Sequence, residues 1–301
     1  MKRFISWPGA KYRQLKMLLQ YATNIGVGTA LCEPFFGTGC FTMHFIRKAR
    51  GRVYASDSCE PLYSWWNYLI NHTDIFVKEL ARASEHVRNS VNSKEDFALL
   101  RNQWNQLNED DPGSIEVAAL LWPMIYKSTN NLARFNKTGK YGQSYGHGRN
   151  IPNTEAVFDS EGIEIIEYLR EGMATGCFVR SCFECLDLFL YDLNSVNGAF
   201  CFLDPPYIVS NDVYSRGSWG IEDVYRLRGI IQDLENAGVP WMMTEYFKKG
   251  DVVHPLAEDY RSNFRVFPLD RKCDAAPRMA QVPADEVVVV GSSNRINETL
   301  F

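Results

Sequence analysis

The sequence lacks a hydrophobic run long enough to cross a membrane. Its longest apolar stretch, residues 117–126, is interrupted by Pro123, whereas a membrane-spanning helix needs about 20 apolar residues. The first residues include Lys2 and Arg3 and reach Pro8 before any apolar segment of signal-peptide length. We therefore expect no membrane partner, no export and a cytoplasmic location.

Cysteine is also scarce. Eight cysteines among 301 residues are too few for a disulfide scaffold, so reduced thiols are expected. Cys182 and Cys185, with Cys177 just upstream, could supply three zinc ligands. No second pair and no histidine at ligand spacing follows, so the sequence predicts buried thiols and no metal site.

An excess of positive charge is missing from the chain as a whole, because the formal net charge is −4. This balance excludes a protein coated with nucleic acid over its whole surface. Residues 127–149 are different, since they contain five basic residues and no acidic one. The sequence therefore concentrates its positive charge in one stretch.

The remaining pattern alternates strands and helices. Leucines at 15, 18 and 19 predict an amphipathic helix over residues 12–23. A strand at 29–33, a glycine turn, a helix at 40–47 and a strand at 52–56 follow. Further elements are expected over residues 178–180, 199–203, 241–244 and 286–290 as strands and 221–237 as a helix. This order predicts an α/β fold with a doubly wound, mostly parallel, Rossmann-like sheet.

One segment interrupts the alternation. Residues 71–107 have a polar helical pattern, 114–126 form a more apolar helix, and 127–153 are rich in Gly, Asn, Lys and Tyr. We therefore predict a mainly helical inserted module over 71–150. Residues 1–70 and 151–301 would form the sheet domain.

A tetrapeptide at the end of one predicted strand suggests the chemistry. Asp204 follows residues 200–203 and precedes Pro205, Pro206 and Tyr207. Prolines lack an N–H and restrict the backbone, so preceding carbonyl groups stay free to accept hydrogen bonds beside the carboxylate. An amino group would meet two acceptors there, and the Tyr207 ring suits a planar heterocycle. A plain strand-ending turn is the alternative.

A glycine loop at the first strand-to-helix turn predicts a nucleoside-like ligand. Gly37 and Gly39 allow close approach of a ligand to the backbone. The loop has neither the Gly-Lys-Ser/Thr ending of a phosphate loop nor the full dinucleotide fingerprint. Asp57 follows the second strand, where an acidic side chain commonly binds ribose hydroxyls. A solvated aspartate at a strand end is the alternative.

Four segments together resemble the Dam-type family of S-adenosylmethionine-dependent DNA adenine N6-methyltransferases. Residues 6–12 are similar to its Trp-x-Gly-x-Lys segment, and 33–39 to its Glu-Pro-Phe-x-Gly-x-Gly cofactor loop. Residues 131–136, with Gly139 and Tyr145-Gly146, resemble its Arg-Phe/Tyr-Asn-x-x-Gly signature. Residues 204–207 correspond to its catalytic tetrapeptide. The resemblance implies a methyltransferase sheet, a target-recognition insert and double-stranded DNA as partner, in a bacterial or phage-infected cell.

The resemblance also implies roles for individual residues. Catalysis would depend on Asp204, Pro205, Pro206 and Tyr207. S-adenosylmethionine would be bound by Trp7, Lys11, Glu33, Phe35, Gly37, Gly39, Asp57, Phe183 and Asp204. Core packing of Trp7 and solvation of Lys11 are the alternatives. Cys182 stands where the family often has Asp or Ser, so Phe183 alone would contact the cofactor adenine.

The insert supplies the expected DNA contacts. Arg134, Lys137 and Lys140 are candidate phosphate ligands, and Asn130, Asn131 and Asn136 are candidates for adenine edges. Ordinary solvated surface is the alternative, because asparagine also favours turns. Basic residues Arg271 and Arg278 precede the last predicted strand, as in the family.

Two other functions remain open. An RNA amino methyltransferase can carry a similar tetrapeptide, but the long insert between the cofactor loop and Asp204 resembles the DNA enzymes. A non-catalytic nucleic-acid-binding protein on this fold should have lost a catalytic residue, and residues 204–207 are intact. The sequence indicates neither the recognition site nor the oligomeric state.

Overall fold

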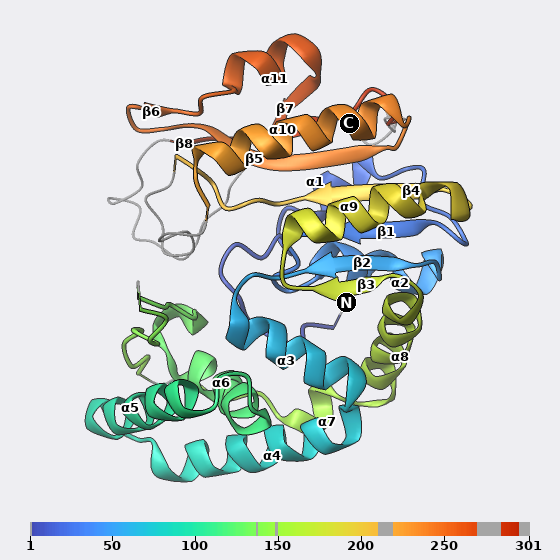
Figure 1. Ribbon diagram of the computed structural model, residues 1–301. Coiled ribbons are helices and arrows are strands. Elements are labelled where there is room, and N and C mark those ends of the chain that lie inside the picture. Colours follow the sequence, from blue (N-terminus) through green and yellow to red (C-terminus); the bar gives the residue numbers. More distant parts are fainter. Residues whose placement is uncertain (1, 137, 148–149, 210–218, 270–283, 295–301) are drawn as a thin grey trace.

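A single mixed sheet organises the structure, which is a computed structural model describing residues 2–136, 138–147, 150–209, 219–269 and 284–294 (Figure 1). The sheet has eight strands, seven of them in the order β3-β2-β1-β4-β5-β8-β7, and β6 pairs with β5. The strands are β1 (Ala30–Glu33), β2 (Val53–Ser56), β3 (Cys177–Val179), β4 (Ala199–Leu203), β5 (Trp241–Lys249), β6 (Val252–Val253), β7 (Arg265–Pro268) and β8 (Ala284–Val290).

The central part of the sheet is parallel, as the alternating pattern predicts. Strands β3, β2, β1, β4 and β5 pair in parallel, whereas β8 runs antiparallel to both β5 and β7. The chain passes from β1 to β2 on one side and later returns to β4 on the other. Such a reversal of strand order opens a crevice at the carboxyl ends of the strands. The predicted fold class is confirmed.

Alternate residues of the central strands pack on opposite faces of the sheet. Cys201 and Leu203 of β4 join a cluster under α9 (Cys182–Asp192) and α10 (Ile221–Asn236). Phe200 and Phe202 point the other way, to α1 (Leu15–Leu18) and α2 (Cys40–Ala49). Because side chains alternate between the two faces, β4 is apolar on both of them, and helices cover each face. The packed helices hold the strands, and therefore the crevice at their carboxyl ends, in place.

The insert is a helical module beside the sheet (Figure 1). It follows α3 (Glu60–Asn71) and contains α4 (Thr73–Ser90), α5 (Lys94–Asp110) and α6 (Ile115–Lys127). Ser93 caps α5 through a capping box with Asp96. The return to the sheet runs through η2 (Thr129–Asn131), α7 (Thr154–Val157) and α8 (Ser160–Thr175). The domain boundaries at 70 and 150 stay a prediction.

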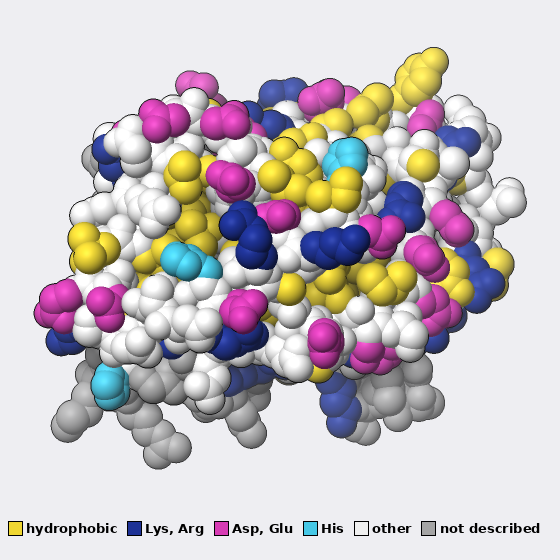
Figure 2. Space-filling model, turned by 90° about the horizontal axis from the view of Figure 1, so that it is seen from below, with side chains coloured by type: hydrophobic (Ala, Val, Ile, Leu, Met, Phe, Trp, Pro, Cys, Tyr) yellow, Lys and Arg dark blue, Asp and Glu magenta, His cyan; other side chains and the backbone are white. Residues whose placement is uncertain are grey.

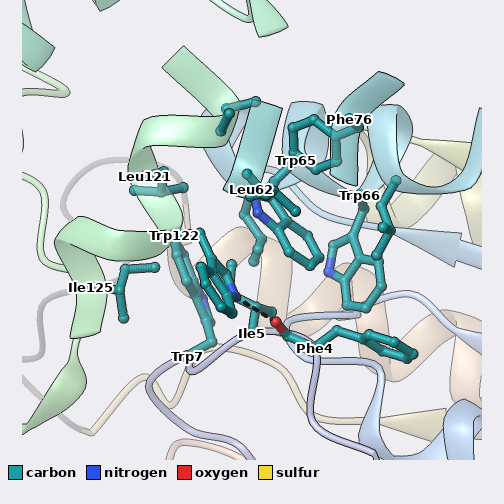
Figure 3. Packing of buried hydrophobic residues seen from close by; sticks show 14 of the residues in the cluster. Phe4, Ile5, Trp7, Leu62, Trp65, Trp66, Phe76, Leu121, Trp122 and Ile125 are labelled. Atoms are coloured by element: carbon teal, nitrogen blue, oxygen red, sulfur yellow. Dashed lines mark hydrogen bonds between the residues drawn. The ribbon is translucent and has the colours of Figure 1, made fainter. Parts of the chain in front are cut away.

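The amino-terminal segment joins the insert to the sheet domain. Phe4, Ile5 and Trp7 lie among tryptophans of α3 and α6 (Figure 3). The Trp122 indole Nε1 donates a hydrogen bond of 2.7 Å to the Phe4 carbonyl oxygen. The Ser6 hydroxyl donates at 2.8 Å to the Asn131 carbonyl. These contacts tie the first residues to the far side of the insert.

Several elements differ from the sequence predictions. The helix expected over 12–23 is reduced to α1 and the 3-10 turn η1 (Leu19–Tyr21), and no side chain caps its start. The helical stretch expected over 71–107 is two helices separated at residues 91–93. Not predicted were α3, α7, α8, α9, α11 (Ala257–Asn263) and the strands β6 and β7.

Within the ranges that the structure describes, no helix has both the length and the apolar content to cross a bilayer. In the same ranges, no three Cys, His, Asp or Glu side chains gather into a group that could hold a metal ion.

Candidate active site

Asp204 lies at the carboxyl end of β4 and is held by two side chains from distant segments. Its carboxylate oxygens lie 2.7 Å and 2.8 Å from the Lys11 ammonium. The Thr244 hydroxyl of β5 donates to Asp204 Oδ1 at 2.5 Å. Lys11 is only 5% exposed, against 18% for Asp204. Lys11 is therefore not a solvated lysine, and the ion pair orients the carboxylate toward the crevice.

Tyr207 forms the next part of the site. Its hydroxyl donates to Glu286 Oε1 at 2.9 Å and lies 3.3 Å from Asp204 Oδ1. Its ring packs edge-on against Tyr246, with centroids 4.5 Å apart and planes at 67°. Burial raises the pKa of Tyr207, and the Asp204 and Glu286 carboxylates raise it further. The side chain therefore remains a neutral phenol with its proton available for donation.

Buried acidic residues surround this pair. Glu33 at the end of β1 and Glu245 on β5 are each 2% exposed, and Glu286 on β8 is 6% exposed. Burial raises the pKa of Glu33 to about 8, and the charge of Asp204 adds to the increase. The same two causes raise the pKa of Glu245. A positively charged ligand nearby would lower these raised pKa values and favour the ionised carboxylates, so this lining fits a cationic ligand.

The glycine loop between β1 and α2 is braced by Asp57. Gly37 and Gly39 have φ values of 49° and 60°, which side chains rarely adopt. A Cβ on Gly39 would lie 2.4 Å from the Phe36 ring. Asp57 Oδ2 accepts from the Gly37 N–H at 2.9 Å, and Oδ1 accepts from the Cys59 N–H at 2.9 Å. Burial raises the pKa of Asp57 to about 6.

An aromatic group stands beside this loop. Phe35 meets Trp219 edge-on with centroids 5.3 Å apart, and Phe183 stacks on Trp219 at 6.0 Å with planes at 12°. Trp219 is 9% exposed, and its indole N–H has no hydrogen-bond acceptor within the described residues. Flat apolar walls with a spare buried donor fit the adenine part of a nucleoside cofactor. The residues present therefore fit S-adenosylmethionine.

Trp7, the remaining predicted cofactor residue, lies next to the loop. A Cβ on Gly37 would be 3.8 Å from the Trp7 Cδ1 atom. On its other side the Trp7 ring lies 6.2 Å from the ring of Phe135 in the insert. Trp7 is thus both a core residue, at 9% exposure, and a contact between the loop and the insert.

The predicted DNA contacts lie on a hairpin-like segment, which we call the recognition hairpin (residues 128–146). Bridges between Ser128 and Tyr145 and between Phe135 and Tyr141 hold it together. Arg134 is exposed on it, while Asn131 is half-buried with φ at 53°. Lys137, Arg271 and Arg278 lie outside the described residues.

Two predicted DNA residues already have partners. The Asn136 side-chain oxygen accepts hydrogen bonds from the Thr138 N–H at 2.9 Å and the Lys140 N–H at 3.0 Å, which is the turn-forming behaviour typical of asparagine. The Lys140 ammonium lies 2.7 Å from Glu109 of α5. The outer face of the helical module mixes basic and acidic side chains (Figure 2). The recognition hairpin is therefore the better candidate for a phosphate-binding surface.

The chain matches the model of a known enzyme family. The model of the D12 class N6 adenine-specific DNA methyltransferases matches residues 7–267. The chain belongs to this class. The Type II methyltransferase M.FokI of Planomicrobium okeanokoites is 22% identical over 224 residues, which are 72% of this chain and 32% of that relative. The chain therefore spans about a third of the length of that relative.

Membership of the D12 class bears on the functions left open by the sequence. The members of the class are adenine-specific DNA methyltransferases. Membership therefore favours the DNA enzyme over an RNA methyltransferase. The matched range includes the segment at Trp7, the glycine loop, the recognition hairpin and residues 204–207. Glu286 and strand β8 lie beyond its end.

Sequence reasoning missed four residues of this site. Thr244 is the last residue of the strand predicted over 241–244, and Glu245 directly follows it. Glu286 is the first residue of the last predicted strand, and Trp219 stands alone between Ser218 and Gly220. A polar residue at the end of an apolar stretch was the available signal for the first three. No local pattern marks Trp219.

Proposed function

We propose that this chain transfers a methyl group from S-adenosylmethionine to the N6 amine of an adenine in double-stranded DNA. One observation carries the proposal: the Asp204 carboxylate, held by Lys11 and Thr244, lies beside Tyr207 at the strand-reversal crevice of a D12-class chain. When bound, the cofactor supplies a methyl group activated on a sulfonium.

Asp204 and Pro205 would act on the adenine amine. The N6 lone pair is delocalised into the ring, so the amine is a poor nucleophile until hydrogen bonds localise that pair. The Asp204 carboxylate and the Pro205 carbonyl would accept the two N–H bonds and stabilise positive charge that develops on nitrogen. Nitrogen gains the methyl group and loses one proton, for which Asp204 is the adjacent base.

Lys11 gives this step its geometry. Its ammonium contacts both Asp204 oxygens, and Thr244 occupies a further position on Oδ1. A carboxylate has about four acceptor positions, so Asp204 keeps capacity for the amine.

The cofactor would lie along the glycine loop. Phe35, Phe183 and Trp7 offer its aromatic contacts, Gly37 and Gly39 allow close approach of the backbone, and Asp57 is placed for ribose hydroxyls. A cationic centre near Glu33 would lower its raised pKa and favour the charged carboxylate. Each of these assignments follows the resemblance as well as the local geometry.

The target base would have to leave the duplex. A stacked adenine cannot reach Asp204, so it must be flipped out at a cost of a few kcal/mol. Tyr207 would stack on the extruded ring. Arg134, Lys137 and Lys140 of the recognition hairpin would offset part of the cost through phosphate contacts.

Expression in cells whose DNA carries no adenine methylation provides the test. We expect sequencing to find N6-methyladenine at one short recurring sequence in cells with the wild-type chain and none with Asp204→Ala. Asp187→Ala, which changes a 64% exposed carboxylate on α9, should methylate like the wild type. A wild-type chain that leaves the DNA unmodified, or an active Asp204→Ala variant, would contradict the proposal.

A further inference from the structure

Glu286 is a buried acidic residue directly before the four valines of β8. It precedes Val287, Val288, Val289 and Val290 on β8 and is 6% exposed. Burying a carboxylate costs free energy unless hydrogen bonds compensate. Its position follows from the register, because β8 pairs Glu286 with Tyr246 of β5, and the Tyr246 ring packs on Tyr207. The sheet thus carries a carboxylate to the Tyr207 hydroxyl.

We propose that Glu286 is a positioning residue for methyl transfer, which holds the Tyr207 ring in the orientation that stacks on the target adenine. The inference rests on the proposed function, because it assigns Tyr207 to the flipped base. It concerns a strand that lies beyond the residues matched by the D12 class.

Contacts of different kinds restrain the Tyr207 ring. Tyr246 packs on it edge-on at 4.5 Å, the Lys11 ammonium lies 5.0 Å from its centroid, and its hydroxyl donates a hydrogen bond to Glu286 at 2.9 Å. The first two contacts restrain the position of the ring, but neither holds its far end. The directional hydrogen bond to Glu286 sets the plane that the ring presents to a base.

Glu286 also leaves Asp204 available to the substrate. Tyr207 has a single O–H, which is closer to Glu286 Oε1, at 2.9 Å, than to Asp204 Oδ1, at 3.3 Å. Without an acceptor on β8, the phenol would donate to Asp204 Oδ1, which Lys11 and Thr244 already contact, and would leave this carboxylate fewer acceptor positions for the adenine amine. Loss of Glu286 therefore affects both base stacking and the acceptor for N6.

The test replaces Glu286 with an apolar residue of similar length. On a duplex with the sequence found by the methylation experiment, we expect Glu286→Leu to lower the single-turnover methylation rate about tenfold, as typical of losing a hydrogen bond to a charged group. Fluorescence of 2-aminopurine placed at the target adenine should fall as well. Affinity for S-adenosylhomocysteine should stay within about twofold, since Glu286 does not line the glycine loop.

Two variants distinguish positioning from stability. Glu286→Gln retains an oxygen acceptor and should recover most of the loss. Asp285→Asn changes the neighbouring residue on the same strand, which pairs with Arg261 at 3.3 Å on the surface, and should leave the methylation rate unchanged.

A double-mutant cycle examines the link to Tyr207 directly. Tyr207→Phe keeps the ring and removes the hydroxyl, so adding Glu286→Leu to it should change the rate less than about twofold. If the two substitutions lower the methylation rate independently, so that their effects multiply, the inference is overturned. It is also overturned if Glu286→Leu has the rate and the fluorescence of the wild type. If Glu286→Leu fails to fold by circular dichroism, unaltered rate and fluorescence in Tyr207→Phe would overturn it instead. A wild-type chain that does not methylate DNA would contradict the proposed function, and not only the role of Glu286.

Discussion

The carboxylates of the site differ in their contacts and their burial, and these differences give them different roles. Asp204 contacts an ammonium and a hydroxyl at the carboxyl end of β4. Glu33 is buried, and the pKa rises to about 8. Both carboxylate oxygens of Asp57 accept hydrogen bonds from backbone N–H groups, one from Gly37 of the glycine loop and one from Cys59. Residue type alone would not separate these roles, whereas their partners do.

Asp57→Ala should weaken binding of S-adenosylhomocysteine by about 1 to 3 kcal/mol, the cost of removing a charged hydrogen-bond partner. Gly37 would lose the acceptor that holds its strained conformation, and the ribose would lose its proposed ligand. Calorimetry measures the affinity, with Asp187→Ala as the exposed control. An unchanged dissociation constant in Asp57→Ala would show that Asp57 does not bind the cofactor.

Glu33→Gln should change how stability depends on pH. The pKa of Glu33 is about 8 in the folded protein against an ordinary value of 4.5, so the folded state keeps a proton that the unfolded state releases. The free energy of unfolding therefore falls as pH rises from about 4.5 to about 8, and this contribution is constant outside that window.

Urea unfolding of the wild type and Glu33→Gln between pH 4 and 9 provides the measurement. Across this window the free energy of unfolding of the wild type should fall relative to that of Glu33→Gln. Parallel curves would show that Glu33 is ionised in the folded protein.

At the scale of elements, local signals predicted most of the sheet. Residues 199–203 coincide with β4, and the glycine loop after β1 lies where the turn residues place it. Helix α3 was missed because the tryptophans Trp65 and Trp66 face different neighbours and leave little polar face to read. Strand β7 was missed because it exists through pairing with β8, which is distant in sequence. The same holds for Thr244 and Glu286, which reach the site through strand register.

The ion pair between Lys140 and Glu109 gives a prediction for the recognition hairpin. Glu109→Gln should release Lys140 for a phosphate and raise affinity for duplex DNA at low salt about two- to fivefold, the scale of a surface ion pair. The dependence on salt should steepen by up to about one unit.

Titrations with a fluorescent duplex across salt concentrations check this result. Glu79→Gln breaks a comparable surface pair with Arg82 on α4, away from the recognition hairpin, and should leave affinity unchanged. Equal curves for Glu109→Gln and the wild type would place Lys140 outside the DNA surface.

At the scale of the whole molecule, the amino-terminal segment connects three regions. Phe4 and Ser6 bond to the insert, Trp7 lies beside the glycine loop, and Lys11 reaches Asp204. A stretch of eight positions thus touches the insert, the cofactor loop and the catalytic carboxylate. The resemblance predicted two of these contacts in part, but not the hydrogen bonds to the insert, because nothing in a short segment identifies a partner more than one hundred residues away.

Trp122→Phe should destabilise the folded chain more than Trp65→Phe. Both tryptophans are fully buried, but Trp122 Nε1 donates to the Phe4 carbonyl, whereas Trp65 Nε1 has no acceptor within the described residues. The two changes remove similar volume, so their difference isolates the hydrogen bond, at about 1 to 3 kcal/mol. Urea unfolding measures both variants, and equal losses would show that the bond does not fasten the segment.

Strand β8 has a consequence for how the chain is made. Translation delivers β7 before β8, yet β8 pairs with both β5 and β7. Until residues 284–290 leave the ribosome, β5 has an unpaired edge and β7 has no strand to join. The nascent chain therefore carries an exposed sheet edge, of the kind that invites aggregation. The proposed anchor of Tyr207 arrives with β8, so a growing chain would acquire its base-stacking surface only after β8 has paired with β5.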